Sequence, residues 1–150
     1  MPRRQLDFRE FDSIIKDIET LRQQGYTKVG KWDLSQVCRH LSIAMQMSIR
    51  DQKVQSAPWL VRKLVAPIIR RRIFKTRKMP EGIKVPDSIL PGAPVDEAAA
   101  VSKFFIDMKE LRDHKGDFVP HPFFGRLSPG DWQQLHLIHS AHHLSFLIPN

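Results

Sequence analysis

The chain has 150 residues, and its 41% hydrophobic and 27% charged content is ordinary for a globular protein. This length predicts a single domain, residues 1–150, with a sizeable buried core. The single cysteine excludes an internal disulfide, the charged residues 1–10 do not resemble a signal peptide, and the apolar runs are too short to span a membrane. We therefore expect a soluble, cytoplasmic protein.

The formal net charge of +8 is concentrated in one segment. Eight of the 24 basic residues lie between Trp59 and Lys78, where no acidic residue occurs, and the other 16 basic residues equal the 16 acidic ones. Residues 62–78 could contact the phosphates of a nucleic acid, or lie on an anionic membrane with Trp59 and Leu60 embedded beside Leu64 and Ile68. We favour a third interpretation, a solvated basic face whose apolar residues pack on the rest of the protein, because no nucleic-acid-binding motif is present.

Apolar residues at helical spacing predict four long helices, over residues 7–24, 33–51, 95–115 and 128–148. Gly25 ends the first helix, Asp33 and Gln36 form a capping box for the second, and Ser128 with Pro129 begins the fourth. Residues 54–94 contain six prolines, which predicts short helical pieces at 59–73 and an extended crossover at 79–94. No strand signal is present. We expect an all-α four-helix bundle with a long crossover between helices 2 and 3.

Four of the seven histidines lie in the fourth helix: His136, His139, His142 and His143. The i, i+4 spacing puts His139 and His143 on one face, where two imidazoles can bind one metal ion. His40, on the inner edge of the second helix, is the best candidate for a third ligand, and His136 is its main rival. Three imidazoles would leave a coordination position open, as in catalytic zinc sites. The alternative is that all are core or surface histidines bonded to backbone or solvent.

The remaining polar candidates have simpler interpretations. His142 is expected to line the wall of the pocket, and Gln36, one turn before His40, is a candidate contact behind the ligands. His114 and His121 are expected on the solvated surface. Cys38 is expected to be a small buried hydrophobe and not a nucleophile.

A second apolar seam runs along the back of the fourth helix through Leu137, Ala141, Leu144 and Ile148. A helix that is apolar on two sides is either central in its own chain or shared with a partner. The seam therefore suggests a homodimer.

Three segments, WDLSQVCRHL (32–41), HPFFGRLSPGDW (121–132) and HSAHHL (139–144), resemble the DinB/YfiT-like superfamily of metal-binding four-helix bundles. The last two particularly resemble a branch known only as a domain of unknown function. The resemblance implies that His40, His139 and His143 hold a divalent metal ion, nickel or zinc foremost, with water completing the coordination sphere. The chain departs from the commoner pattern at residues 144–146, where a Gly-Gln or Arg-Gln pair often follows the histidines.

Relatives in that superfamily include low-molecular-weight-thiol S-transferases, a thiol-dependent isomerase and proteins labelled metal-dependent hydrolases. The resemblance thus implies an enzyme acting on an unidentified small molecule, with a low-molecular-weight thiol as a second cofactor. The metal would lower the pKa of a bound thiol or water and so generate the nucleophile. Three alternatives stay open: a hydrolase, a non-catalytic bundle that binds nucleic acid or anionic membrane through residues 62–78, and a structural bundle with incidental histidines.

Overall fold

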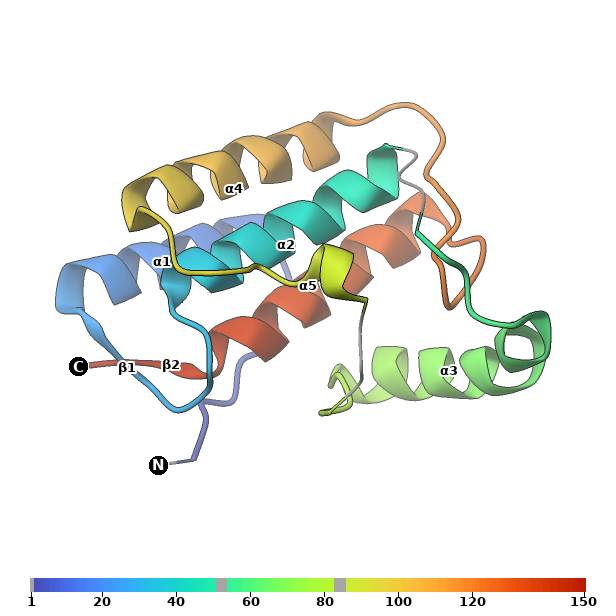
Figure 1. The fold of residues 1–150 in the computed structure, drawn as a ribbon, viewed down its shortest axis with the longest axis horizontal. Helices are drawn as coiled ribbons and strands as arrows, with labels where there is room; N and C mark the ends of the chain where they lie inside the picture. The colour runs from blue at the N-terminus through green and yellow to red at the C-terminus, as the bar shows by residue number, and fades with distance from the viewer. Residues whose placement is uncertain (1, 51–53, 83–85) are drawn as a thin grey trace.

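The computed structural model describes residues 2–50, 54–82 and 86–150. Over these ranges the chain is mostly helical, with one small antiparallel sheet (Figure 1). In chain order the elements are α1 (Phe11–Gln24), β1 (Tyr26–Lys28), α2 (Leu34–Ile49), η1 (Val61–Val65), α3 (Ala66–Thr76), η2 (Asp87–Ile89), α4 (Glu97–Asp113), α5 (Pro129–Leu144) and β2 (Leu147–Pro149). The element η1 is a π-helical turn and η2 is a 3-10 turn. The helices α1, α2, α4 and α5 correspond to the four predicted ones.

Three predicted helix boundaries are confirmed, while α1 begins at Phe11 and not at residue 7, and α4 spans Glu97–Asp113 and not residues 95–115. Asp33 accepts a hydrogen bond from the backbone N–H of Gln36 at 2.9 Å, and the Gln36 side chain accepts one from the Asp33 N–H at 3.2 Å, so the capping box of α2 is confirmed. Ser128 Oγ accepts from the Asp131 N–H at 3.1 Å at the start of α5. Gly25 ends α1 with φ of 72°, a left-handed conformation that favours glycine. The predicted end of α2 at residue 51 lies outside the described ranges.

The long helices bury their apolar stripes against one another in a main core. Its largest fully buried side chains are Ile14, Ile18 and Leu21 of α1, Leu34, Leu41 and Met45 of α2, Phe104, Met108 and Leu111 of α4, and Leu144 of α5. A second cluster joins α3 to α5 through Ile73, Leu127, Trp132, Leu135 and Ile138. No helix within the described ranges is long and apolar enough to cross a membrane.

The absence of strands and the extension of the fourth helix to residue 148 were wrong predictions. The helix α5 ends at Leu144, and β2 then pairs antiparallel with β1, with Tyr26 opposite Pro149 and Lys28 opposite Leu147. The Ser145 hydroxyl donates to the His142 carbonyl at 2.6 Å at this end. A three-residue strand has too few positions to show alternation, so only the contact between distant segments reveals it.

The apolar seam on α5 belongs to the main core of this chain. Leu137, Ala141 and Leu144 are buried among side chains of the other long helices, and Ile148 lies on β2. The helix is therefore apolar on two sides because it is central in its own chain. The homodimer loses the basis on which it was predicted and stays a prediction, which light scattering can test.

The segment before the crossover forms a helical arm, η1 followed by α3, at the edge of the molecule (Figure 1). Ile73 anchors it in the second cluster. The expectation that its apolar residues pack on the rest of the protein was wrong for Trp59, Leu60, Leu64 and Ile68, whose side chains are exposed. The arm contacts the protein along one face, so the residues on its opposite face remain in solvent.

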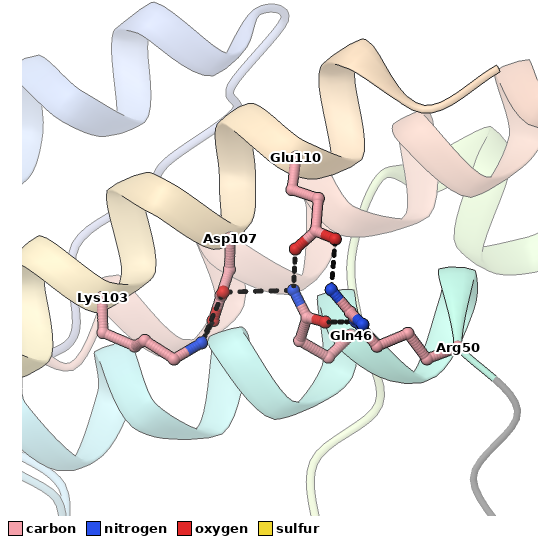
Figure 2. A network of polar contacts seen from close by, with 5 residues as sticks. All are labelled: Gln46, Arg50, Lys103, Asp107 and Glu110. Atoms are coloured by element: carbon pink, nitrogen blue, oxygen red, sulfur yellow. Dashed lines mark hydrogen bonds and ion pairs between the residues drawn. The ribbon is translucent and has the colours of Figure 1, made fainter.

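A polar network joins α2 to α4 (Figure 2). The Gln46 side-chain amide donates to Asp107 Oδ1 at 3.1 Å and to Glu110 Oε2 at 2.9 Å. Lys103 Nζ donates to Asp107 Oδ2 at 2.6 Å, and Arg50 pairs with Glu110. The Asp107 side chain is only 2% exposed, so these donors offset the cost of burying its carboxyl group.

Replacing Lys103 with alanine should lower the free energy of unfolding by about 1–3 kcal/mol, because a buried carboxylate then loses its cationic partner. Urea unfolding monitored by circular dichroism measures this change. The control is Lys109→Ala, which removes a similar i, i+4 pair with Asp113 in which both side chains are exposed. That variant should stay within about 0.5 kcal/mol of the parent; equal losses in both variants would contradict a special role for the buried carboxylate.

Candidate metal centre

Three histidines from two helices meet at one point in the structure. His40 comes from α2, and His139 and His143 come from successive turns of α5. The Nε2 atom of His139 lies 3.2 Å from Nε2 of His40 and 3.0 Å from Nε2 of His143. The candidate ligand atoms all lie within 4.8 Å of one another. These are the three residues that the helical spacing and the resemblance select.

The protonation of His40 follows from its second nitrogen. His40 Nδ1 lies 2.7 Å from the carbonyl oxygen of Ile89, and a carbonyl can only accept a hydrogen bond. In neutral His40 the proton is therefore on Nδ1, and Nε2 directs a lone pair at His139. This arrangement, a ring N–H held by a backbone carbonyl with the other nitrogen free, is the usual one for a metal-binding histidine.

The three imidazoles do not satisfy each other by hydrogen bonding alone. His139 Nε2 faces two other Nε2 atoms and has at most one proton to give. A tetrahedral zinc ion bound at about 2.0–2.1 Å to each nitrogen would hold the nitrogens about 3.3 Å apart. The observed separations of 3.0 and 3.2 Å are close to that value. The donor set therefore fits a divalent metal ion.

Burial keeps the triad neutral. It is the main cause that lowers the pKa of His40 and His139 and brings the pKa of His143 to about 2. The neighbouring imidazoles lower the pKa of His139 and His143 further, because protonating one ring disfavours a charge on the next. Neutral imidazoles offer the lone pairs that a metal needs at physiological pH.

Trp32 and the crossover hold the triad in place. The Trp32 ring lies over both His143, with centroids 5.1 Å apart, and His40, at 4.9 Å. The Gln36 side chain, which was predicted to lie behind the ligands, donates to the Gly92 carbonyl at 2.7 Å. This hydrogen bond connects the crossover segment to α2. The same segment brings the Ile89 carbonyl to His40.

The other two histidines of α5 lie outside the triad. His136, the rival ligand, is buried, and its Nε2 lies 3.0 Å from the Ser48 hydroxyl. His142 lies beside the site, with its ring centroid 4.8 Å from that of His143 and its Nδ1 3.3 Å from Arg3 Nη1. His142 therefore lies next to the triad, and its place on the wall of a pocket stays a prediction.

The expectation of a solvated surface position was wrong for His121. Its Nδ1 accepts hydrogen bonds from the backbone N–H groups of Phe123 and Phe124 at 3.0 and 3.1 Å, and burial lowers its pKa to about 4. The imidazole of His121 thus stabilises the turn made by the residues that follow it. The position of His121 in a predicted loop does not reveal this contact. Cys38 is buried as expected, and burial raises the pKa of its thiol to about 12, so it is not a thiolate nucleophile.

Two features of the site have no signal in the sequence. The Ile89 carbonyl is a backbone group 49 residues from His40, so residue type does not mark it. Arg3 reaches the rim from the N-terminal segment, where it pairs with Glu81 at 2.8 Å and places its guanidinium over the Phe146 ring. Both depend on how distant parts of the chain meet.

The fold and the triad together define a mostly helical protein with a three-histidine site that could bind a metal ion. Residues 1–150 match the family model described as "Protein of unknown function (DUF1569)". The chain belongs to that family. Neither the curated proteins nor the solved structures include a match to the chain.

Proposed function

We propose that this protein is a divalent-metal-dependent enzyme with a DinB-like four-helix-bundle fold, acting in the cytoplasm on a small molecule with a low-molecular-weight thiol as co-substrate. The observation that carries the proposal is the convergence of His40, His139 and His143. The resemblance of three segments to the DinB/YfiT-like superfamily supports both the fold and the thiol chemistry. We expect nickel or zinc as the bound ion, because imidazole nitrogen suits both.

The chain's own residues prepare the site for this chemistry. The Ile89 carbonyl fixes the tautomer of His40, and the Trp32 ring covers the triad on one side. When bound, a divalent ion lowers the pKa of a coordinated thiol or water. In the transfer, the thiol sulfur forms a bond to an electrophilic carbon, the leaving group departs with its electron pair, and the thiol proton passes to solvent.

A direct test compares metal-loaded and chelator-treated protein for transfer of cysteine or glutathione to an aryl chloride, with chloride as the leaving group. Activity should require the metal and should be lost in His143→Ala. The matched control is Cys38→Ser, a buried position on the same helix as His40, which should keep the activity of the parent. Ester hydrolysis without thiol transfer would favour the metal-dependent hydrolase. A loaded protein inactive in both screens would overturn catalysis and leave the metal site standing.

A further inference from the structure

The helical arm presents an unusual outer face. Trp59, Leu60, Leu64 and Ile68 are 66%, 56%, 60% and 70% exposed. Five basic side chains of the same segment are also exposed: Lys63, Arg71, Arg72, Lys75 and Lys78. We call these nine residues together the basic-apolar face. Large apolar side chains gathered on a surface mark a site of interaction.

A π-helical turn aligns the apolar part of this face. Positions i and i+4 drift by about 40° in a regular α-helix. In η1 the Ala66 N–H bonds to the Val61 carbonyl, five residues earlier, so the chain winds less per residue there. Pro67 has no N–H and crowds the preceding turn, which accounts for the wider turn before it. The result is one stripe that contains Leu60, Leu64 and Ile68.

The inner face of the arm is fixed to the rest of the protein. Ile73 is 1% exposed within the second cluster. Arg70 pairs with Asp131 at 2.5 Å, and Arg77 pairs with Asp7 at 2.5 Å and donates to the Phe8 carbonyl at 2.6 Å. These contacts hold the middle and the C-terminal end of α3 against the protein, so the basic-apolar face is turned outward by packing.

The charges on the outer face are available to a partner. No ion pair found over residues 2–50, 54–82 and 86–150 involves the exposed basic residues of the face. No acidic residue occurs between Trp59 and Lys78. Lys63 Nζ lies 5.4 Å from the centre of the Trp59 ring, which places a cation and an indole side by side at the surface.

We propose that the basic-apolar face docks this protein on an anionic lipid surface, with Trp59, Leu60, Leu64 and Ile68 in the headgroup region and the lysines and arginines on the lipid phosphates. Tryptophan and leucine beside basic residues are typical of helices that lie in a membrane interface. Each basic residue adds attraction to an anionic leaflet. The proposed binding is peripheral, with the protein lying on the lipid surface. No helix over the described ranges is long and apolar enough to cross a bilayer.

The same observations disfavour two other occupants. A second copy of the chain would bring an equally basic arm against this one, and the like charges would repel. A nucleic acid would use the charges, but Leu60, Leu64 and Ile68 find no apolar partner on a phosphate backbone. Base stacking needs exposed aromatic rings, and besides Trp59 the segment has only Phe74, which is packed in the second cluster with the Arg70 guanidinium over its ring.

Vesicle co-sedimentation of the full chain tests the proposal, with vesicles of phosphatidylcholine alone and of phosphatidylcholine with phosphatidylglycerol. Binding should require phosphatidylglycerol and should weaken as salt rises. The tryptophan emission of the chain should shift to shorter wavelength on binding, because Trp59, unlike Trp32 and Trp132, is exposed. The triple variant Lys63→Gln, Arg71→Gln, Arg72→Gln should bind about 100-fold more weakly, and Leu64→Ser with Ile68→Ser should also lose binding. All of these positions are exposed, and circular dichroism verifies that the variants fold.

Matched controls separate this face from general charge and hydrophobicity. The variant Lys16→Gln, Arg22→Gln, Lys115→Gln removes the same charge from exposed positions elsewhere, and Ile106→Ser removes an isoleucine that is 64% exposed on α4. Both controls should bind vesicles within about twofold of the parent. Absence of vesicle binding at low salt, equal losses in the controls, or binding of duplex DNA without binding of vesicles would each overturn the proposal.

Discussion

Metal-free protein should gain thermal stability when zinc or nickel is added, and the His139→Ala and His143→Ala variants should not. A ligand that binds only the folded state stabilises it by about 2.7 kcal/mol at 100 times its Kd. For a chain of this length that corresponds to a rise in Tm of about 5–10 °C. The physical reason is the convergence of three Nε2 atoms, two pairs of which are 3.0 and 3.2 Å apart. Elemental mass spectrometry should find about one ion per chain in the parent.

His142→Ala is the matched control for this result. This substitution removes the histidine next to His143. Because the Nδ1 atom of His142 faces Arg3 and not the triad, the variant should keep both the metal and the rise in Tm. Metal retained in His139→Ala and His143→Ala would contradict the triad, and so would a parent protein that binds no metal after reconstitution. If only His142→Ala lost the metal, the metal would be bound at His142, beside the triad.

The free energy of unfolding of the metal-free protein should fall as the pH drops from 6.5 to 4.5. Burial lowers the pKa of His121 to about 4 and that of His136 to about 3, from an ordinary value of 6.5. Between the folded and unfolded pKa values, the unfolded chain binds protons that the folded chain does not. The stability that these two neutral histidines contribute is therefore complete above pH 6.5 and is lost progressively as the pH falls below it. Each group contributes at most about 1.4 kcal/mol per pH unit, and less close to its folded or unfolded pKa, so the two together should cost about 4 kcal/mol between pH 6.5 and 4.5.

The local geometry agrees with this direction of change. His121 Nδ1 accepts two backbone N–H bonds, and a protonated Nδ1 accepts neither. Urea unfolding at several pH values, with a chelator present to keep the triad free of metal, measures the slope. His136→Gln should reduce the slope by about 1.4 kcal/mol per pH unit. A stability that stays constant or rises between pH 6.5 and 4.5 would contradict the assignment.

The order of the four long helices, the start of α2 and α5 and the end of α1 could be predicted from the sequence because these features are local. Asp33 with Gln36, Ser128 and Gly25 act within one turn of the chain, and each defines the boundary predicted for it. The pairing of His139 with His143 is local for the same reason, since the i, i+4 spacing brings two side chains to one face of any α-helix.

The closing of the site was decided by tertiary structure. His40 lies 99 residues before His139, and periodicity in a helix defines its inner face without defining which helix that face meets. The Ile89 carbonyl that sets the tautomer of His40 is a backbone group and carries no residue signature. The rival ligand His136 could be separated from the triad only when α2 placed Ser48 against it.

The exposure of the helical arm shows most clearly the difference between what local sequence predicts and what tertiary packing decides. From the sequence, the apolar residues of this segment, which include Leu60, Leu64, Ile68 and Ile73, are expected to pack on the rest of the protein. Packing buries Ile73 in the second cluster and leaves the other three in solvent. The sequence by itself determined four amphipathic helices, a histidine pair and a basic segment, because each depends on neighbours within a few turns. Tertiary structure decided the meeting of His40 with the histidine pair, the β1–β2 pairing and the outward face of the arm, because each depends on which distant surfaces meet.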